Sequence, residues 1–119
     1  MSIKKNTTLG NIKISDEAVA TLTGSAVIEC YGVVGMTSQK PLKDGFNELF
    51  KRENYSKGVV IKNIDGGIEV DLYCVIGYGV KITEVINEIQ KRVKYTLEKS
   101  LDIDVLAVNV YVQGIKVVG

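Results

Sequence analysis

One segment of this chain, residues 68–76, constrains its fold more than any other because its side chains alternate strictly in character. Ile68, Val70, Leu72, Cys74 and Ile76 share one face of an extended strand, and Glu69, Asp71, Tyr73 and Val75 share the other. This alternation predicts a sheet with one buried and one more open face. Residues 59–64 read as a preceding strand, and Asp65-Gly66-Gly67 supplies a tight hairpin turn.

The segments that follow predict a helix and a closing strand. Gly77-Tyr78-Gly79 breaks the extended run, and residues 83–100 form an amphipathic helix with an apolar stripe of Ile82, Val85, Ile86, Ile89, Val93 and Leu97. Leu106, Val108, Val110 and Val112 then alternate with other residues in a last strand. A strand–helix–strand connection usually leaves its strands parallel and makes a right-handed crossover, which we expect for the strands on either side of this helix.

The N-terminal part predicts a tail, a short strand and a second helix. Residues 1–8 read as a flexible tail, residues 10–14 as a strand, and Ser15 as the N-cap of a helix over residues 16–31. The helix contains no lysine or arginine, and small residues line the side away from its apolar stripe. A solvated helix back normally carries charge, so Thr21, Gly24, Ser25 and Ile28 predict a close contact, either with the following segment or with another chain.

The middle of the chain is less regular. Gly32 ends the helix, residues 37–40 read as a polar loop, and Pro41 suits the start of a short helix. Phe46, Leu49 and Phe50 recur at helical spacing, which predicts a helix ending near residue 54. The expected fold class is therefore α+β: a single domain over residues 9–119, in the order β-α-(short α)-β-β-α-β. We expect a small mixed sheet of three or four strands with the helices on one face.

Composition narrows the function classes. The 119 residues carry a net charge of +1, which offers no overall field for nucleic acid or anionic lipid. There is no histidine, the commonest general base, and Cys30 and Cys74 both lie in apolar runs typical of reduced core thiols. We expect no metal and no cofactor. The N-terminus has no apolar signal segment and no apolar run approaches the ~20 residues of a membrane span, which favours a cytoplasmic protein.

Two short patterns invite a chemical interpretation. Glu69 and Asp71 are paired carboxylates on one strand face, a combination that can do acid–base work, but no nucleophile or histidine accompanies them. Gly77-Tyr78-Gly79 lies between a strand and a helix, as phosphate-binding loops do. It lacks a third glycine and a Lys-Ser/Thr pair, so a simple turn explains it better. We expect no catalytic residues and no enzymatic activity.

A third pattern supports an alternative function. Gly32, Val33, Val34 and Gly35 match the Gly-x-x-Gly loop with which KH-type domains grip a nucleic-acid backbone between two helices. The middle residues are both valine and no basic residue adjoins them, whereas phosphate binding favours positive charge. A KH-like nucleic-acid-binding module is the alternative interpretation of this sequence.

The sheet offers a possible interaction surface. Tyr73 and Tyr111 both lie on the expected outer face, where they would form an aromatic patch with Val75 and Ala107 if their strands are neighbours. Tyrosine is enriched in protein–protein interfaces. Tyrosines that merely cover a sheet are an equally good interpretation, and we carry the protein contact as a hypothesis.

Several stretches together resemble the alkaline-shock (Gls-type) envelope stress response family of Gram-positive bacteria. They are Gly-Asn-Ile-Lys-Ile-Ser at residues 10–15, Tyr-Gly-Val-Val-Gly-Met at 31–36, Ser-Lys-Gly-Val-Val at 56–60, Ile-Glu-Val-Asp-Leu-Tyr-Cys-Val-Ile-Gly-Tyr-Gly-Val-Lys-Ile at 68–82, and Val-Asn-Val-Tyr-Val at 108–112. The resemblance covers about residues 9–115. Thr83 departs from it, since many members have proline at that position.

The resemblance implies a small cytoplasmic protein that is not an enzyme and has a role in cell-envelope homeostasis and stress. It implies protein partners: self-association as a homo-oligomer, or a small membrane-anchored protein that would hold the chain at the membrane. The family supplies no catalytic or metal-binding residues to carry over.

Overall fold

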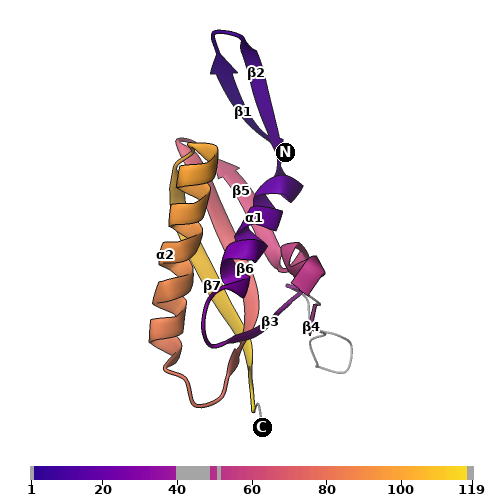
Figure 1. Ribbon diagram of the computed structural model, residues 1–119, viewed down its shortest axis with the longest axis vertical. Coiled ribbons are helices and arrows are strands. Elements are labelled where there is room, and N and C mark those ends of the chain that lie inside the picture. Colours follow the sequence, from indigo (N-terminus) through magenta and orange to yellow (C-terminus); the bar gives the residue numbers. More distant parts are fainter. Residues whose placement is uncertain (1, 40–48, 51, 118–119) are drawn as a thin grey trace.

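The computed structural model describes residues 2–39, 49–50 and 52–117 of the chain. Its elements follow in the order β1 (Ser2–Thr7), β2 (Gly10–Ser15), α1 (Asp16–Ile28), β3 (Val33–Thr37), β4 (Leu49–Phe50), the 3₁₀ helix η1 (Arg52–Gly58), β5 (Val59–Ile64), β6 (Gly67–Gly77), α2 (Ile82–Leu101) and β7 (Val105–Lys116). Figure 1 shows two layers, with α1 and α2 side by side on one face of the sheet. The α+β class and the placement of the helices are confirmed.

Strand β6 is the centre of a mixed five-stranded sheet. One of its edges pairs with the parallel strand β7 along nearly its whole length, and the other pairs antiparallel with β5 and then β3. The two-residue strand β4 extends the sheet beyond β3. The parallel β6–α2–β7 crossover was predicted, whereas β3 and β4 bring the sheet to one strand more than the three or four expected.

The β5–β6 hairpin has the predicted bounds and turn. Ile64 pairs with Gly67, so Asp65 and Gly66 form the loop, and Gly66 has a φ of +91°, a conformation that glycine adopts at little cost. Gly67 is required for a different reason: a Cβ built there would lie 2.2 Å from the backbone oxygen of Asp104. The start of β6 therefore packs directly on the chain that leads into β7.

The core lies between the inner face of β6 and the two helices. Helix α2 buries the predicted stripe of Val85, Ile89, Val93 and Leu97 and ends at Asp102 in the left-handed conformation. Helix α1 contributes Val19, Ala26 and Val27 to the same core, with Cys30 just beyond its end. Because apolar burial is the main stabilising term in folding, this shared core holds both helices on one side of the sheet.

Helix α1 begins as predicted and ends earlier. The Ser15 Oγ accepts a hydrogen bond from the backbone N–H of Ala18 at 3.1 Å, which is the expected N-cap. The helix stops at Ile28 rather than at residue 31, and Gly32 follows with a φ of +93°. Three residues, 29–31, therefore separate the helix from the glycine that redirects the chain into β3.

Three expectations were wrong. Residues 2–7, expected in the flexible tail, form β1, which pairs antiparallel with β2 because extended polar chain folds back at the Thr8–Leu9 turn. Residues 33–37, expected at a helix end and in a loop, form β3 on the edge of β6. Leu49 and Phe50, expected in a helix, form β4, and η1 follows. Pro41 and Phe46 lie outside the described residues.

A β-bulge corrects the expected register of the last strand. Ile68 pairs with Val105 and Glu69 pairs with Ala107, so Leu106 has no opposing residue on β6. Val105 is buried in the position expected for Leu106, which is half exposed. From Val108 to Val112 the predicted alternation holds, with Val108 opposite Val70 and Val110 opposite Leu72, and a second register shift follows at Gln113.

Candidate functional site

The outer face of the sheet carries a buried carboxylate. Asp71 is only 3% exposed, although α1 and α2 both pack on the opposite face of the sheet. Its Oδ2 lies 3.0 Å from the Lys62 Nζ on β5, and its Oδ1 accepts a hydrogen bond of 2.9 Å from the Asn109 Nδ2 on β7. The same amide nitrogen donates to the Glu69 Oε1 at 2.8 Å. Both Asp71 oxygens are thus engaged, and the contacts of Asp71 with Lys62 and of both carboxylates with Asn109 form a cross-strand clamp.

The clamp alters the lysine that it binds. The hydrogen bond and charge of Asp71 raise the pKa of the Lys62 ammonium. Sequence reasoning missed Lys62 and Asn109 because they come from two other strands, and only the register places them beside Asp71. The one signal in the sequence that could have identified the Lys62–Asp71 pair is the opposite charge of residues on neighbouring strands.

Tyr73 and Tyr111 lie side by side on the outer face of the sheet, as predicted for the case in which their strands are neighbours. Tyr73 and Tyr111 pair across β6 and β7, and their rings stack with centroids 4.9 Å apart and planes 11° from parallel. Tyr73 is only 7% exposed and Val75 is also buried, which corrects the expectation of an open face, whereas Tyr111 is 45% exposed. Gln113 contributes to this cover, since its Nε2 donates to the backbone oxygens of Ser38 and Gln39. Burial raises the pKa of the Tyr73 hydroxyl.

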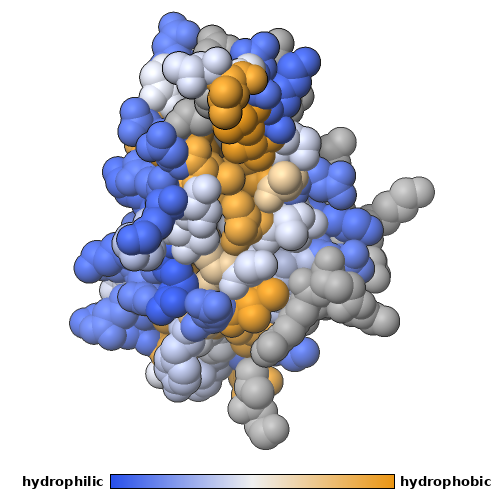
Figure 2. Space-filling model, turned by 45° about the horizontal axis from the view of Figure 1, so that its top comes forward, coloured by the Kyte–Doolittle hydropathy of each residue, from blue (hydrophilic) through white to orange (hydrophobic). Residues whose placement is uncertain are grey.

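The uncharged side of α1 divides into a buried and an exposed part. Gly24 is buried, and a Cβ there would lie 3.2 Å from the Tyr55 Cβ of η1, so the predicted close contact is made by the following segment. Ile28 is half buried, and Thr21 and Ser25 are exposed. Figure 2 shows an apolar band down the middle of the molecule, bordered on the left by hydrophilic residues.

The Gly-x-x-Gly segment does not form a nucleic-acid clamp. Val33 and Gly35 belong to β3 and pair with Ile76 and Val75 of β6, and the Gly32 carbonyl accepts a hydrogen bond from the Gly77 N–H at 2.9 Å. A KH-type loop joins two helices, whereas this segment is part of the sheet because its valines pack as strand residues. The structure therefore contradicts the predicted loop geometry of the alternative.

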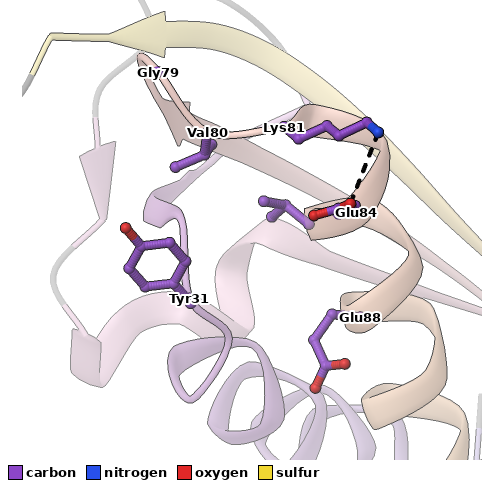
Figure 3. Close-up of a pocket in the computed structure, with 7 residues that line it drawn as sticks. Tyr31, Gly79, Val80, Lys81, Glu84 and Glu88 are labelled. Carbon is purple, nitrogen blue, oxygen red and sulfur yellow. Dashed lines mark ion pairs between the residues drawn. The ribbon is translucent and has the colours of Figure 1, made fainter.

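The helices also border a small open cleft of about 250 Å³. Figure 3 shows Tyr31, on the turn after α1, on one side and Glu84 and Glu88 of α2 on the other. Lys81 lies 3.8 Å from Glu84, and Arg92 makes 3.0 Å ion pairs with both Glu88 and Glu29, which tie α2 to the end of α1. The cleft is smaller than the ~300–1,000 Å³ typical of small-molecule sites. Each charged group that lines the cleft is in an ion pair, Lys81 with Glu84 and Glu88 with Arg92.

The thiols and the remaining titratable groups add no reactive centre to the described part of the chain. Cys30 and Cys74 are both free and buried, and burial raises the pKa of the Cys74 thiol to about 11. In residues 2–39, 49–50 and 52–117, no three side chains of the metal-binding types converge on a common point. Over the same residues, neither helix combines the length and the apolar character of a membrane-spanning segment.

The fold and these surfaces define a two-layer α+β domain whose polar groups pair with one another across strands and helices. The chain belongs to the alkaline shock protein 23 family, described as having a cell envelope-related function, whose family model matches residues 4–117. This finding confirms the resemblance of the sequence to that family. No solved structure matches the chain significantly.

Proteins similar to this chain along nearly its whole length include examples from Streptococcus pyogenes and Bacillus subtilis. An uncharacterised protein of Streptococcus pyogenes, Spy1614, is 53% identical over 119 residues, covering all of this chain and 98% of the relative. The uncharacterised protein YloU of Bacillus subtilis is 43% identical over 117 residues, covering 98% of each chain. The uncharacterised protein YqhY of Bacillus subtilis is 31% identical over 112 residues, covering 94% of this chain and 82% of the relative.

Proposed function

We propose that this chain is a non-enzymatic cytoplasmic interaction protein in cell-envelope homeostasis and stress response. It acts through self-association or through a membrane-anchored protein partner. The observation that carries the proposal is the family match over residues 4–117, whose description is a cell envelope-related function.

The surface chemistry supports this proposal. A general acid or base must reach the proton that it transfers, and both oxygens of the best carboxylate candidate, Asp71, are instead directed at Lys62 and Asn109. Helix α1 instead presents Thr21 and Ser25 to solvent without a lysine or arginine anywhere along it. Interface cores are depleted in charged residues, and this helix fits that composition.

A deletion strain of the native host tests the proposal. We expect it to grow more poorly than its parent under alkaline and cell-wall stress, and the wild-type gene to restore growth. Ser25→Lys, which places a charge on the exposed side of α1, should restore growth less well. Asn87→Lys, at an exposed position of α2, is the matched control and should restore it fully. A deletion strain that grows like its parent under both stresses would refute the envelope role.

A further inference from the structure

Strand β7 ends the sheet, and the first half of its outer edge is covered by side chains of α2. The Val105 N–H donates to the Glu98 Oε2 at 3.0 Å, and the Val108 carbonyl accepts from the Gln90 Nε2 at 3.0 Å. These two residues therefore direct backbone groups away from β6. An exposed edge invites pairing with another strand, and capping by side chains is one way of preventing it.

Within the described part of the chain, the second half of the same edge has no such cover. Backbone direction alternates along a strand, so Val110 and Val112 point their N–H and C=O groups to the same side as Val108. Among the described residues, no hydrogen bond engages these outward groups. The four groups form a short, regular template for another strand.

The part of α2 beside this template is apolar. Ile82 and Ile86 precede Gln90 by eight and four residues, which places them on the same stripe of the helix. Ile82 is 38% exposed, and Ile115, near the end of β7, is 47% exposed. Gln90 and Glu98 of α2 thus lie beside the capped half of the β7 edge, and Ile82 and Ile86 lie beside the uncapped half.

The segment of β7 around Tyr111 carries neither charge nor proline. Residues 105–115 contain no charged residue and no proline, two of the devices that block an exposed edge, and the two bulges of the strand, at Leu106 and Gln113, leave residues 107–112 in regular register. β7 is also long, running from Val105 to Lys116. An uncapped, uncharged edge of this length favours a partner strand.

We propose that the partner is a second copy of this chain, paired antiparallel with β7 about a two-fold axis at Tyr111. Val110 of each copy lies opposite Val112 of the other, and the two pairs exchange four backbone hydrogen bonds. The two sheets become one continuous sheet. This inference deepens the proposed function, on which it rests, by naming the surface through which self-association occurs.

Self-pairing suits the residues at this edge. In an antiparallel pair centred on Tyr111, the two copies of that residue form a non-hydrogen-bonded pair, in which side chains approach most closely. The Tyr73–Tyr111 stack would then continue into the same stack of the second copy. No like charges meet across residues 105–115, and isologous two-fold dimers are the commonest assemblies.

Disulfide trapping tests the geometry directly in the purified full chain. Directly opposed residues of a non-hydrogen-bonded pair have Cα atoms ~4.5 Å apart, within the range that a disulfide spans. Tyr111→Cys should form a covalent dimer on mild oxidation. Tyr31→Cys, at an exposed tyrosine on the turn after α1, is the matched control and should remain monomeric. The native thiols are buried and should not contribute.

Sedimentation over a concentration series tests the interface without a cross-link. Val112→Pro removes an outward N–H and no bond to β6, and it should weaken dimerisation about tenfold or more while the far-ultraviolet circular dichroism is retained. Tyr111→Lys should do the same by opposing two like charges, whereas Tyr31→Lys should not. A wild-type chain that stays monomeric at every concentration, or cross-linking from Ser25→Cys but not from Tyr111→Cys, would overturn the proposal. These results concern the purified protein, so they are separable from the growth of a deletion strain.

Discussion

Replacing Asp71 tests whether the clamp on the outer sheet face stabilises the fold. In Asp71→Ala, the Asn109 amide loses a charge-assisted hydrogen bond of 2.9 Å, although it keeps its bond to Glu69. Loss of a hydrogen bond to a charged group costs about 1.5–3 kcal/mol of unfolding free energy. The contact with Lys62 adds little, because that ammonium is largely exposed and its attraction is screened by solvent.

For a chain of this size, a loss of about 1.5–3 kcal/mol corresponds to a fall in Tm of about 6–12 °C. Urea denaturation of the purified chain measures the free energy, and the slope of the transition should stay unchanged. Asp71→Asn should cost less than Asp71→Ala, since its amide oxygen can still accept from Asn109.

Glu84→Ala provides the control, because it removes an exposed carboxylate whose ion pair with Lys81 spans 3.8 Å. We expect it to change stability by less than about 0.5 kcal/mol. If Asp71→Ala proved no more destabilising than Glu84→Ala, the clamp would not contribute to stability, and the reasoning from burial and bond geometry would be wrong.

Three further predictions follow from the same structure. Gly67→Ala should destabilise the fold strongly, because its Cβ would overlap the backbone oxygen of Asp104. In Gly66→Ala the Cβ meets nothing within 4 Å, so this variant should lose only about 1–2 kcal/mol of unfolding free energy, for its positive φ. Thermal unfolding of both variants measures the difference. The pKa of Lys62 is raised in the folded state, so its contact with Asp71 stabilises the fold below the usual lysine pKa of about 10.4. This stabilisation is lost as the pH rises through the higher folded pKa. The stability difference between wild type and Lys62→Met, measured by urea titration, should therefore shrink at strongly alkaline pH. Cys74, with a pKa near 11, should resist thiol reagents in the native state and react only on unfolding, and rapid native labelling would contradict its burial.

The sequence predicted the elements whose signals are local. The β5–β6 hairpin follows from the alternation in residues 68–76 and the Asp65-Gly66 turn, and α2 follows from its apolar stripe. The missed elements depend on distant partners. β3 is short and contains two glycine-flanked valines, so its identity as a strand comes from pairing with β6. β1 is polar, and its pairing with β2 leaves no periodic pattern.

In the candidate site, too, local sequence patterns placed some residues, and only contacts between distant segments placed the others. Alternation placed Asp71 and Tyr73 on the outer face correctly, but their burial depends on Asn109 and Tyr111, which reach them only through the parallel register of β7. The absence of lysine and arginine along α1 did indicate a close contact, and the structure identifies Tyr55 as the residue that Gly24 meets. A single sequence holds the composition of a surface, whereas the strand register decides which residues meet on it.

The position of β6 has a consequence for the local and global opening of the native protein. This strand is bonded along nearly its whole length on both edges, to β7 on one and to β5 and β3 on the other, whereas the β1–β2 hairpin forms a separate sheet of its own. Its amide protons should therefore exchange with deuterium only when the whole domain opens, and those of the hairpin should exchange through local fraying. The slowest-exchanging amides of the described chain would then mark the segment that unfolds last. The fastest-exchanging amides would mark the segment that unfolds first.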